Sequence, residues 1–396
     1  MGRLVTQFIE FIRFRQSRTF GSILGERKGE GPGFAILRVG LAVGIFLMHS
    51  RMLSTAGSVV PIVGPAVDGH AAWSGPMRPV YVVLVPAFFA LSGFLVTGSA
   101  LRLRNTGTFL TFRVLRILPA LFVEVTLCAI VLGSAFTTLP LRSYFTHYGF
   151  WRYFGNIVGI ITFYLPGVFL QNRMSIVNAN LWTLPSEFDC YFITAILMAT
   201  GLFYKIKTVT GVVVVVSIVF AVLNAANGFA AAPFQYTSLT ITYYFFIGMA
   251  FFYWKSRIPA RWSLFIAAVA LSYAFLYSQR TIFIAPIFVV YCVVFLGVAA
   301  LPEIGALKTR DYSYGIYLYG FPITQGLVAA FPGLVGHKVI VSLAALTLTT
   351  LFAATSWKYV EKPTLALKKS VPAWADAALR RSGFRSAEIS VQASDS

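Results

Sequence analysis

The sequence has 396 residues, of which 58% are hydrophobic and only 11% are charged. Its mean hydropathy of +0.76 excludes an ordinary soluble domain and indicates a membrane protein that crosses the bilayer several times. In a soluble domain the formal net charge of +19 would suggest nucleic acid, but in a membrane protein it is the usual excess of Lys and Arg in cytoplasmic loops. We therefore expect membrane lipids, and no nucleic acid, among its partners.

Residues 1–33 are predicted to be a cytoplasmic basic leader. Apolar side chains between Phe8 and Phe14 lie beside Arg13, Arg15 and Arg18, which is typical of an amphipathic helix on a membrane surface. Glu10 and Arg13 interrupt this apolar cluster, so it does not resemble a cleavable signal peptide. Residues 34–365 are expected to form the membrane domain, and residues 366–396 a basic cytoplasmic tail that is mobile at its end.

The apolar runs predict an all-α, polytopic membrane domain with about ten transmembrane helices. Residues 150–170 are apolar but contain Arg152 and Pro166, and a crossing there would leave Lys205 and Lys207 outside. We interpret this segment as re-entrant or interfacial, which places most Lys and Arg, and both termini, in the cytoplasm. The predicted spans are approximately residues 34–53, 80–101, 117–132, 180–203, 211–227, 236–254, 262–278, 282–301, 312–331 and 339–357.

Arg38 and His49 lie in the first predicted span, where ionisable residues are costly and default to a functional role. Eleven helical steps of about 1.5 Å separate them by roughly 16 Å, about half the hydrocarbon thickness. The neighbouring Ser50 and Arg51 leave open the alternative that His49 only marks the membrane interface. Glu124, in the third span, is expected either to act directly or to pair with an arginine or another polar group.

The three cysteines, Cys128, Cys190 and Cys292, lie in apolar runs without the spacing of a redox or metal site. We expect them to be small packing residues, and we expect no metal.

Several motifs, in order along residues 34–365, resemble the membrane acyltransferase-3 family of bacterial integral membrane O-acyltransferases. The sequence matches the family in Arg-x10-His and Arg-x-x-Arg pairs, in a Ser-Gly segment, in a Trp-x-Leu-x-x-Glu segment and in two final spans. These motifs are Arg38 to His49, Phe88 to Leu95, Arg113 to Pro119, Leu181 to Phe188, Tyr312 to Tyr319 and Tyr359 to Pro363. The length implies the stand-alone form, without the C-terminal esterase-like domain that some members carry.

The resemblance implies that Arg38, Arg113 and Arg116 bind acyl-CoA, usually acetyl-CoA. Two arginines one helical turn apart suit bidentate contacts to phosphates, although ordinary membrane anchors would look alike. His49 is the implied base for an acceptor hydroxyl, or an acyl-accepting relay.

Glu187 is our preferred partner for orienting the His49 ring and the second implied catalytic residue. The alternative is a residue that only begins a helix after Pro185. Ser92, Gly93 and Trp182 are expected to pack helices or to line the acyl passage.

Two positions depart from the family pattern. Gly320 replaces a histidine found in many members, and Asp189 adds an acid beside the Trp-x-Leu-x-x-Glu segment.

The predicted function is a transmembrane O-acyltransferase in the bacterial inner membrane, with acetyl as the expected group. It would use cytoplasmic acyl-CoA and a hydroxyl of an extracytoplasmic carbohydrate, such as a polysaccharide, lipopolysaccharide or glycolipid. The alternative is a polytopic carrier or flippase for a glycan or lipid-linked sugar, although we find no internal repeat with matched broken helices.

Overall fold

The structure is a computed structural model that describes residues 18–27, 29, 31–57, 75–227, 238–278, 281–298 and 311–370. Within these ranges the chain forms helices and irregular connections, with isolated bridges at Thr19–Pro259 and Thr137–Val168 but no strands. The amphipathic part of the predicted leader and most of the predicted tail lie outside the described residues.

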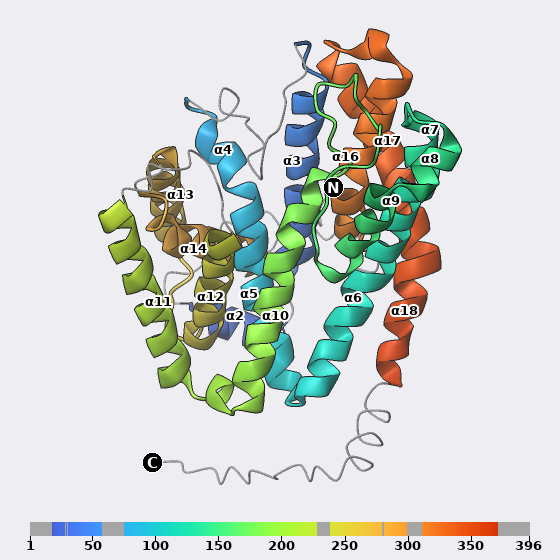
Figure 1. Ribbon diagram of the computed structural model, residues 1–396. Coiled ribbons are helices and arrows are strands. Elements are labelled where there is room, and N and C mark those ends of the chain that lie inside the picture. The colour runs from blue at the N-terminus through green and yellow to red at the C-terminus, as the bar shows by residue number, and fades with distance from the viewer. Residues whose placement is uncertain are drawn as a thin grey trace, which may run out of the picture.

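Each of the ten predicted spans coincides with a helix in the bundle shown in Figure 1. The helices are α2 (Phe20–Glu26), α3 (Gly33–Leu53), α4 (Arg78–Val82), α5 (Leu84–Leu103), α6 (Thr106–Leu127), α7 (Gly133–Phe136), α8 (Leu141–Thr146), α9 (Tyr148–Tyr153), α10 (Leu184–Ala199), α11 (Ile206–Asn227), α12 (Ser238–Trp254), α13 (Trp262–Tyr277), α14 (Ala285–Val298), α16 (Ser313–Ala330), α17 (Lys338–Ser356) and α18 (Lys362–Ala366).

Four helical stretches in the described residues are long and apolar enough to cross a membrane. They are Gly33–Leu53, Arg78–Leu103, Thr106–Phe136 and Lys338–Lys369. Three shorter apolar helices lie at Ile206–Val222, Trp262–Tyr277 and Ala285–Val298. The chain is therefore a helical membrane protein, and the number of ten crossings stays a prediction.

The segment at residues 150–170 does not form a transmembrane helix. After α9 a short 3-10 turn covers Phe154–Val158, and irregular chain follows. The Asn156 side chain closes this loop, because its Nδ2 donates to the carbonyls of Tyr153 at 2.7 Å and Thr162 at 2.9 Å. Residues 150–170 therefore form no helix long enough to cross a membrane, and their re-entrant or interfacial position stays a prediction.

Helix α6 begins eleven residues earlier than the predicted third span. Arg104, at a φ of 53°, ends α5, and the Asn105 side chain caps α6 by accepting from the Thr108 N–H at 2.8 Å. Because this turn is short, α6 already begins at Thr106 and therefore includes Arg113 and Arg116. The helix that contains the predicted third span thus also contains both arginines.

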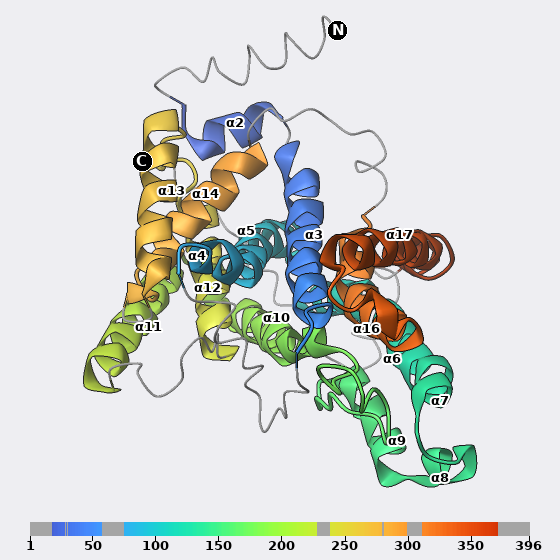
Figure 2. The same cartoon turned by 90° about the horizontal axis from the view of Figure 1, so that it is seen from above.

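Glycines allow the central helices to approach closely. A Cβ atom at Gly93 of α5 would clash with the Phe245 carbonyl of α12, and one at Gly248 with the Ala90 carbonyl. Seen from above, α3 lies between α5 on one side and α16 and α17 on the other (Figure 2). This arrangement brings α3, α5, α6, α10, α12 and α16 around one cavity.

Candidate active site

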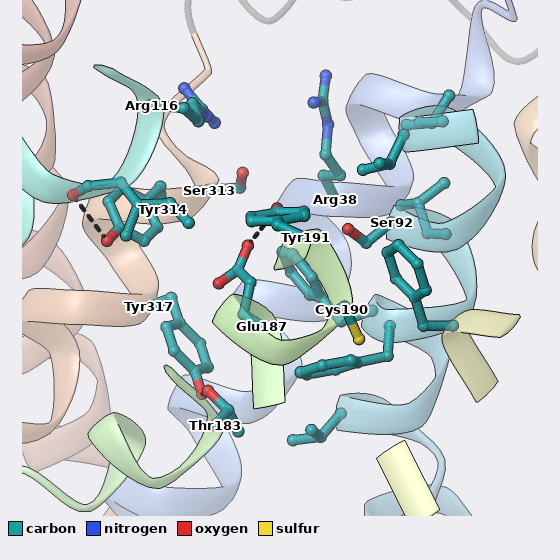
Figure 3. A pocket seen from close by; sticks show the side chains of 18 of the residues that line it. Arg38, Ser92, Arg116, Thr183, Glu187, Cys190, Tyr191, Ser313, Tyr314 and Tyr317 are labelled. Atoms are coloured by element: carbon teal, nitrogen blue, oxygen red, sulfur yellow. Dashed lines mark hydrogen bonds between the residues drawn. The ribbon is translucent and has the colours of Figure 1, made fainter. Parts of the chain in front are cut away.

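A cavity of about 140 Å³ lies among these six helices. Polar side chains line both ends of the cavity, and one carboxylate lies between the two ends, as Figure 3 shows. Arg38 and Arg116 lie at one end and Thr183 and Tyr317 at the other, while Glu187 points into the middle.

The structure brings together the three arginines that the sequence predicts to bind the donor. Arg38 comes from α3, and Arg113 and Arg116 come from α6, where their spacing of three residues places both on one face. Arg113 donates to the Ser99 hydroxyl at 2.9 Å and lies over the rings of Phe109 and Tyr191. The three arginines therefore line one cavity, as the sequence predicts.

Two acidic residues contact the other arginines. Asp311 Oδ2 lies 2.7 Å from Arg116 Nη2 and 3.2 Å from Arg38 Nη1, and Glu361 Oε2 lies 3.5 Å from Arg116 Nη1. Burial alone would raise the pKa of Asp311, but Arg116 and Arg38, with hydrogen bonds from Ser313, hold that pKa below its ordinary value. Asp311 is therefore negatively charged at neutral pH at this end of the cavity.

Glu187 lies in the first turn of α10, where Pro185 at the helix start fits the expectation of a helix-start residue. The Tyr191 hydroxyl, one turn later, donates to Glu187 Oε1 at 2.6 Å. Both side chains line the cavity, so the carboxylate is held where it faces the arginines.

The other end of the cavity is lined by a hydroxyl pair. Thr183 Oγ1 and the Tyr317 hydroxyl lie 2.7 Å apart, and Tyr317 also donates to the Asn180 carbonyl at 2.9 Å. Tyr317 belongs to α16 and Thr183 directly precedes α10, so this contact connects the two helices at this end of the cavity.

His49 is not among the residues that line this cavity. Positions 38, 45 and 49 nevertheless share one face of α3, because seven and eleven residues are close to whole numbers of helical turns. Ile45 lines the cavity, so His49 lies one turn beyond it. The His49 ring meets Phe321 edge-on at 5.3 Å between centroids, and Phe321 in turn lies one turn beyond Tyr317 on α16.

The expected contact between Glu187 and His49 is absent from the described part of the chain. His49 Nδ1 is buried without a hydrogen-bond partner, and Glu187 instead accepts from Tyr191. Among the described residues the two side chains therefore have separate contacts, His49 with Phe321 and Glu187 with Tyr191.

The remaining predicted residues divide between cavity and core. Ser92 lines the cavity, whereas Gly93 packs on α12 and Trp182 packs against the hydrophobic core. Glu124 is fully buried and pairs with neighbouring polar groups, accepting from Asn178 Nδ2 at 2.7 Å and from Cys128 at 3.1 Å. We expected Glu124 either to act directly or to pair with an arginine or another polar group, and its partners in the structure are polar groups.

The three cysteines are free, and Cys190 is one of the cavity's small lining residues. Among the described residues, no three or more His, Cys, Asp or Glu side chains form a group that could hold a metal ion.

Sequence reasoning missed Asp311, Tyr191 and Tyr317 as site residues. Tyr191 could have been found from its spacing, because four residues after Glu187 is one helical turn. Asp311 carried no such signal, since its partners Arg116 and Arg38 are far away along the chain.

The chain is similar in sequence to a known protein family and to known proteins. Residues 32–357 match the family model described as "Acyltransferase domain". The chain is 27% identical over 335 residues to an "O-acetyl transferase" of Shigella phage Sf6, covering 80% of this chain and 96% of the relative. It is 28% identical over 318 residues to "Nodulation protein 10" of Rhizobium leguminosarum bv. viciae, covering 73% of this chain and 83% of the relative.

No solved structure matches the chain. The family model covers most of the membrane domain and includes every residue of the cavity, and both relatives are matched along most of their length. The chain is a membrane enzyme and belongs to the membrane acyltransferase-3 family of O-acyltransferases.

Proposed function

We propose that this enzyme transfers an acetyl group from cytoplasmic acetyl-CoA to a hydroxyl of an extracytoplasmic carbohydrate. The acceptor would be a cell-surface or exported polysaccharide, lipopolysaccharide or glycolipid. The observation that carries the proposal is the convergence of Arg38, Arg113 and Arg116 on one cavity, with His49 on the same face of α3 as Arg38. The relative named O-acetyl transferase supports acetyl as the group transferred.

The arginine end of the cavity is the proposed donor site. Coenzyme A carries several phosphate charges, and guanidinium groups bind phosphate through paired hydrogen bonds. The acyl end of the donor would extend from the arginines past Glu187 toward Thr183 and Tyr317. Glu187 is the proposed second catalytic residue, acting within the cavity rather than through a hydrogen bond to His49.

His49 is the proposed base. Its imidazole takes the proton of the acceptor hydroxyl, the oxygen attacks the thioester carbonyl carbon, and the carbon–sulfur bond breaks. The sulfur leaves with a proton as the free thiol of coenzyme A. In the relay version, a ring nitrogen of His49 attacks the thioester first and the acceptor oxygen then takes the acetyl group.

The distribution of charge supports a cytoplasmic donor in an inner membrane. The α5–α6 turn, the α10–α11 turn and the end of α18 lie at the same edge of the bundle in Figure 1. Arg102, Arg104, Lys205, Lys207 and Lys369 belong to these segments. An excess of Lys and Arg identifies the cytoplasmic side, which would also hold both termini.

The test uses the purified full-length protein, radiolabelled acetyl-CoA and an oligosaccharide acceptor. His49→Ala should abolish labelling of the acceptor, whereas His337→Ala, which removes an exposed histidine outside the cavity, should leave it unchanged. Normal turnover in His49→Ala would reject the base and relay assignments together. Mass spectrometry of surface glycans from deletion and complemented strains would identify the acceptor.

A further inference from the structure

The Asp311 carboxylate joins three helices at the arginine end of the cavity. Its Oδ2 contacts Arg116 of α6 and Arg38 of α3, as described above. Its Oδ1 accepts a hydrogen bond of 2.5 Å from the Ser313 hydroxyl and one of 3.3 Å from the Ser313 backbone N–H. Ser313 begins α16, so the carboxylate is oriented by one helix and holds side chains of two others.

Arg113 differs from its neighbours, because it forms no ion pair within the described ranges. Its contacts are the Ser99 hydroxyl and the rings of Phe109 and Tyr191. Arg116, in contrast, meets both Asp311 and Glu361, and Arg38 meets Asp311. Within the described residues, the Arg-x-x-Arg pair therefore combines one guanidinium that forms ion pairs with one that forms none.

A carboxylate between two guanidiniums has a clear electrostatic effect. Arg38 and Arg116 have the same charge and both approach Asp311 Oδ2, and their side chains are only 33% and 21% exposed. Like charges this close in a partly desolvated site repel one another unless an anion lies between them. Each guanidinium has five N–H donors, so contact with Asp311 leaves further donors free for a second anion.

We propose that Asp311 is a positioning residue for the donor. It fixes the direction of the Arg38 and Arg116 guanidiniums at the cavity, while Arg113, which forms no ion pair in the described part of the chain, supplies a further positive charge for the donor. This inference rests on the proposed function, because the anion concerned is acetyl-CoA. Asp311 acts through the two arginines and does not touch the reacting atoms.

The experiment compares Asp311→Asn with Asp189→Asn. Both remove one negative charge at nearly constant shape, but Asp189 is exposed and forms no ion pair in the described part of the chain. Asp311→Asn should raise the KM for acetyl-CoA about tenfold and change kcat less than about threefold, since it weakens donor binding. Asp189→Asn should leave the KM for acetyl-CoA unchanged. Asp311→Glu, which keeps the charge, should restore a large part of the loss.

An unchanged KM in Asp311→Asn would overturn the proposal. A lowered KM would also overturn it, because the carboxylate would then compete with the donor for the arginines. If Asp311→Asn does not fold, Ser313→Ala replaces it, because it removes the hydroxyl that orients the carboxylate: a raised KM for acetyl-CoA that is absent in Asp189→Asn supports the proposal, and an unchanged KM overturns it.

A second measurement separates this inference from the proposed function. Thermal unfolding in detergent of Arg116→Gln, Asp311→Asn and the double variant forms a mutant cycle that needs no substrate. Additive effects would reject the contact, whatever the turnover. A non-additive cycle in a protein that does not turn over acetyl-CoA would reject the proposed donor while retaining the contact.

Discussion

The Tyr191 hydroxyl donates a 2.6 Å hydrogen bond to the Glu187 carboxylate, one helical turn earlier on α10. Both side chains line the cavity, and the Tyr191 ring also faces the Arg113 guanidinium at 5.6 Å. Tyr191 thus connects the Glu187 carboxylate to Arg113, which forms no ion pair among the described residues.

Tyr191→Phe should lower kcat/KM for acetyl-CoA about tenfold, because hydrogen bonds to charged groups contribute about 1.5–3 kcal/mol. The phenyl ring keeps the contact with Arg113, so the substitution removes the hydroxyl alone. Steady-state kinetics on the purified protein measure the change. Tyr243→Phe is the control, since its hydroxyl bonds Ser217 at 2.9 Å outside the cavity; equal losses in both variants would contradict the role given to Glu187.

Arg113→Ala should raise the KM for acetyl-CoA about tenfold or more with a smaller change in kcat, because it removes from the proposed donor site a guanidinium that forms no ion pair among the described residues. Arg113→Lys should recover only part of this loss, since an ammonium lacks the planar fork of donors. Arg102→Ala, at the exposed end of α5, should behave like the wild type. Similar KM values for all four proteins would show that Arg113 is only a membrane anchor.

Gly93→Ala should destabilise the protein by about 1–3 kcal/mol or more, because the new methyl group meets the Phe245 backbone carbonyl, which cannot rotate away. Gly211→Ala is the matched change in α11, where nothing lies within 4 Å of the new atom. There alanine should stabilise the helix by about 0.5–1 kcal/mol. Thermal unfolding in detergent compares the two, and equal melting temperatures would contradict the close α5–α12 packing.

The Asp311 pKa determines a pH dependence. Since the folded-state pKa lies below the ordinary value of about 3.9, the charged form stabilises the fold above that value. This stabilisation is lost only as the pH falls through the folded-state pKa.

The difference in melting temperature between wild type and Asp311→Asn should therefore stay constant from about pH 8 to pH 5 and shrink below about pH 4. Arg38 and Arg116 remain charged across this range, so they do not alter the sign. A difference that already disappears between pH 7 and pH 5 would mean that the carboxylate is not held by the two guanidiniums.

Helical periodicity explains which parts of the site could be predicted from the sequence. The facing of Arg38 and His49, and of Arg113 and Arg116, depends only on spacing within one helix, and the structure places each pair on a common face. The start of α6 was missed because apolar content marks the membrane core, whereas the cap at Asn105 lies in a polar turn.

Contacts between distant segments could not be predicted in this way. Asp311 meets Arg116 across 195 positions, and Thr183 meets Tyr317 across 134. Such pairs depend on how whole helices pack, and a single sequence contains no signal for that packing. The expected Glu187–His49 contact belongs to this class, and in the structure Glu187 contacts Tyr191 whereas His49 contacts Phe321.

The shared face of Arg38, Ile45 and His49 on α3 sets both the distance and the direction between Arg38 of the proposed donor site and the proposed base His49. One residue inserted after Ile45 would lengthen the path by about 1.5 Å and rotate His49 by about 100° around the helix axis. An insertion of seven residues would restore the direction but move the imidazole about 10 Å farther from Arg38. The number of residues between the arginine and the histidine therefore limits the donors that can span the interval, independently of any side chain that lines it.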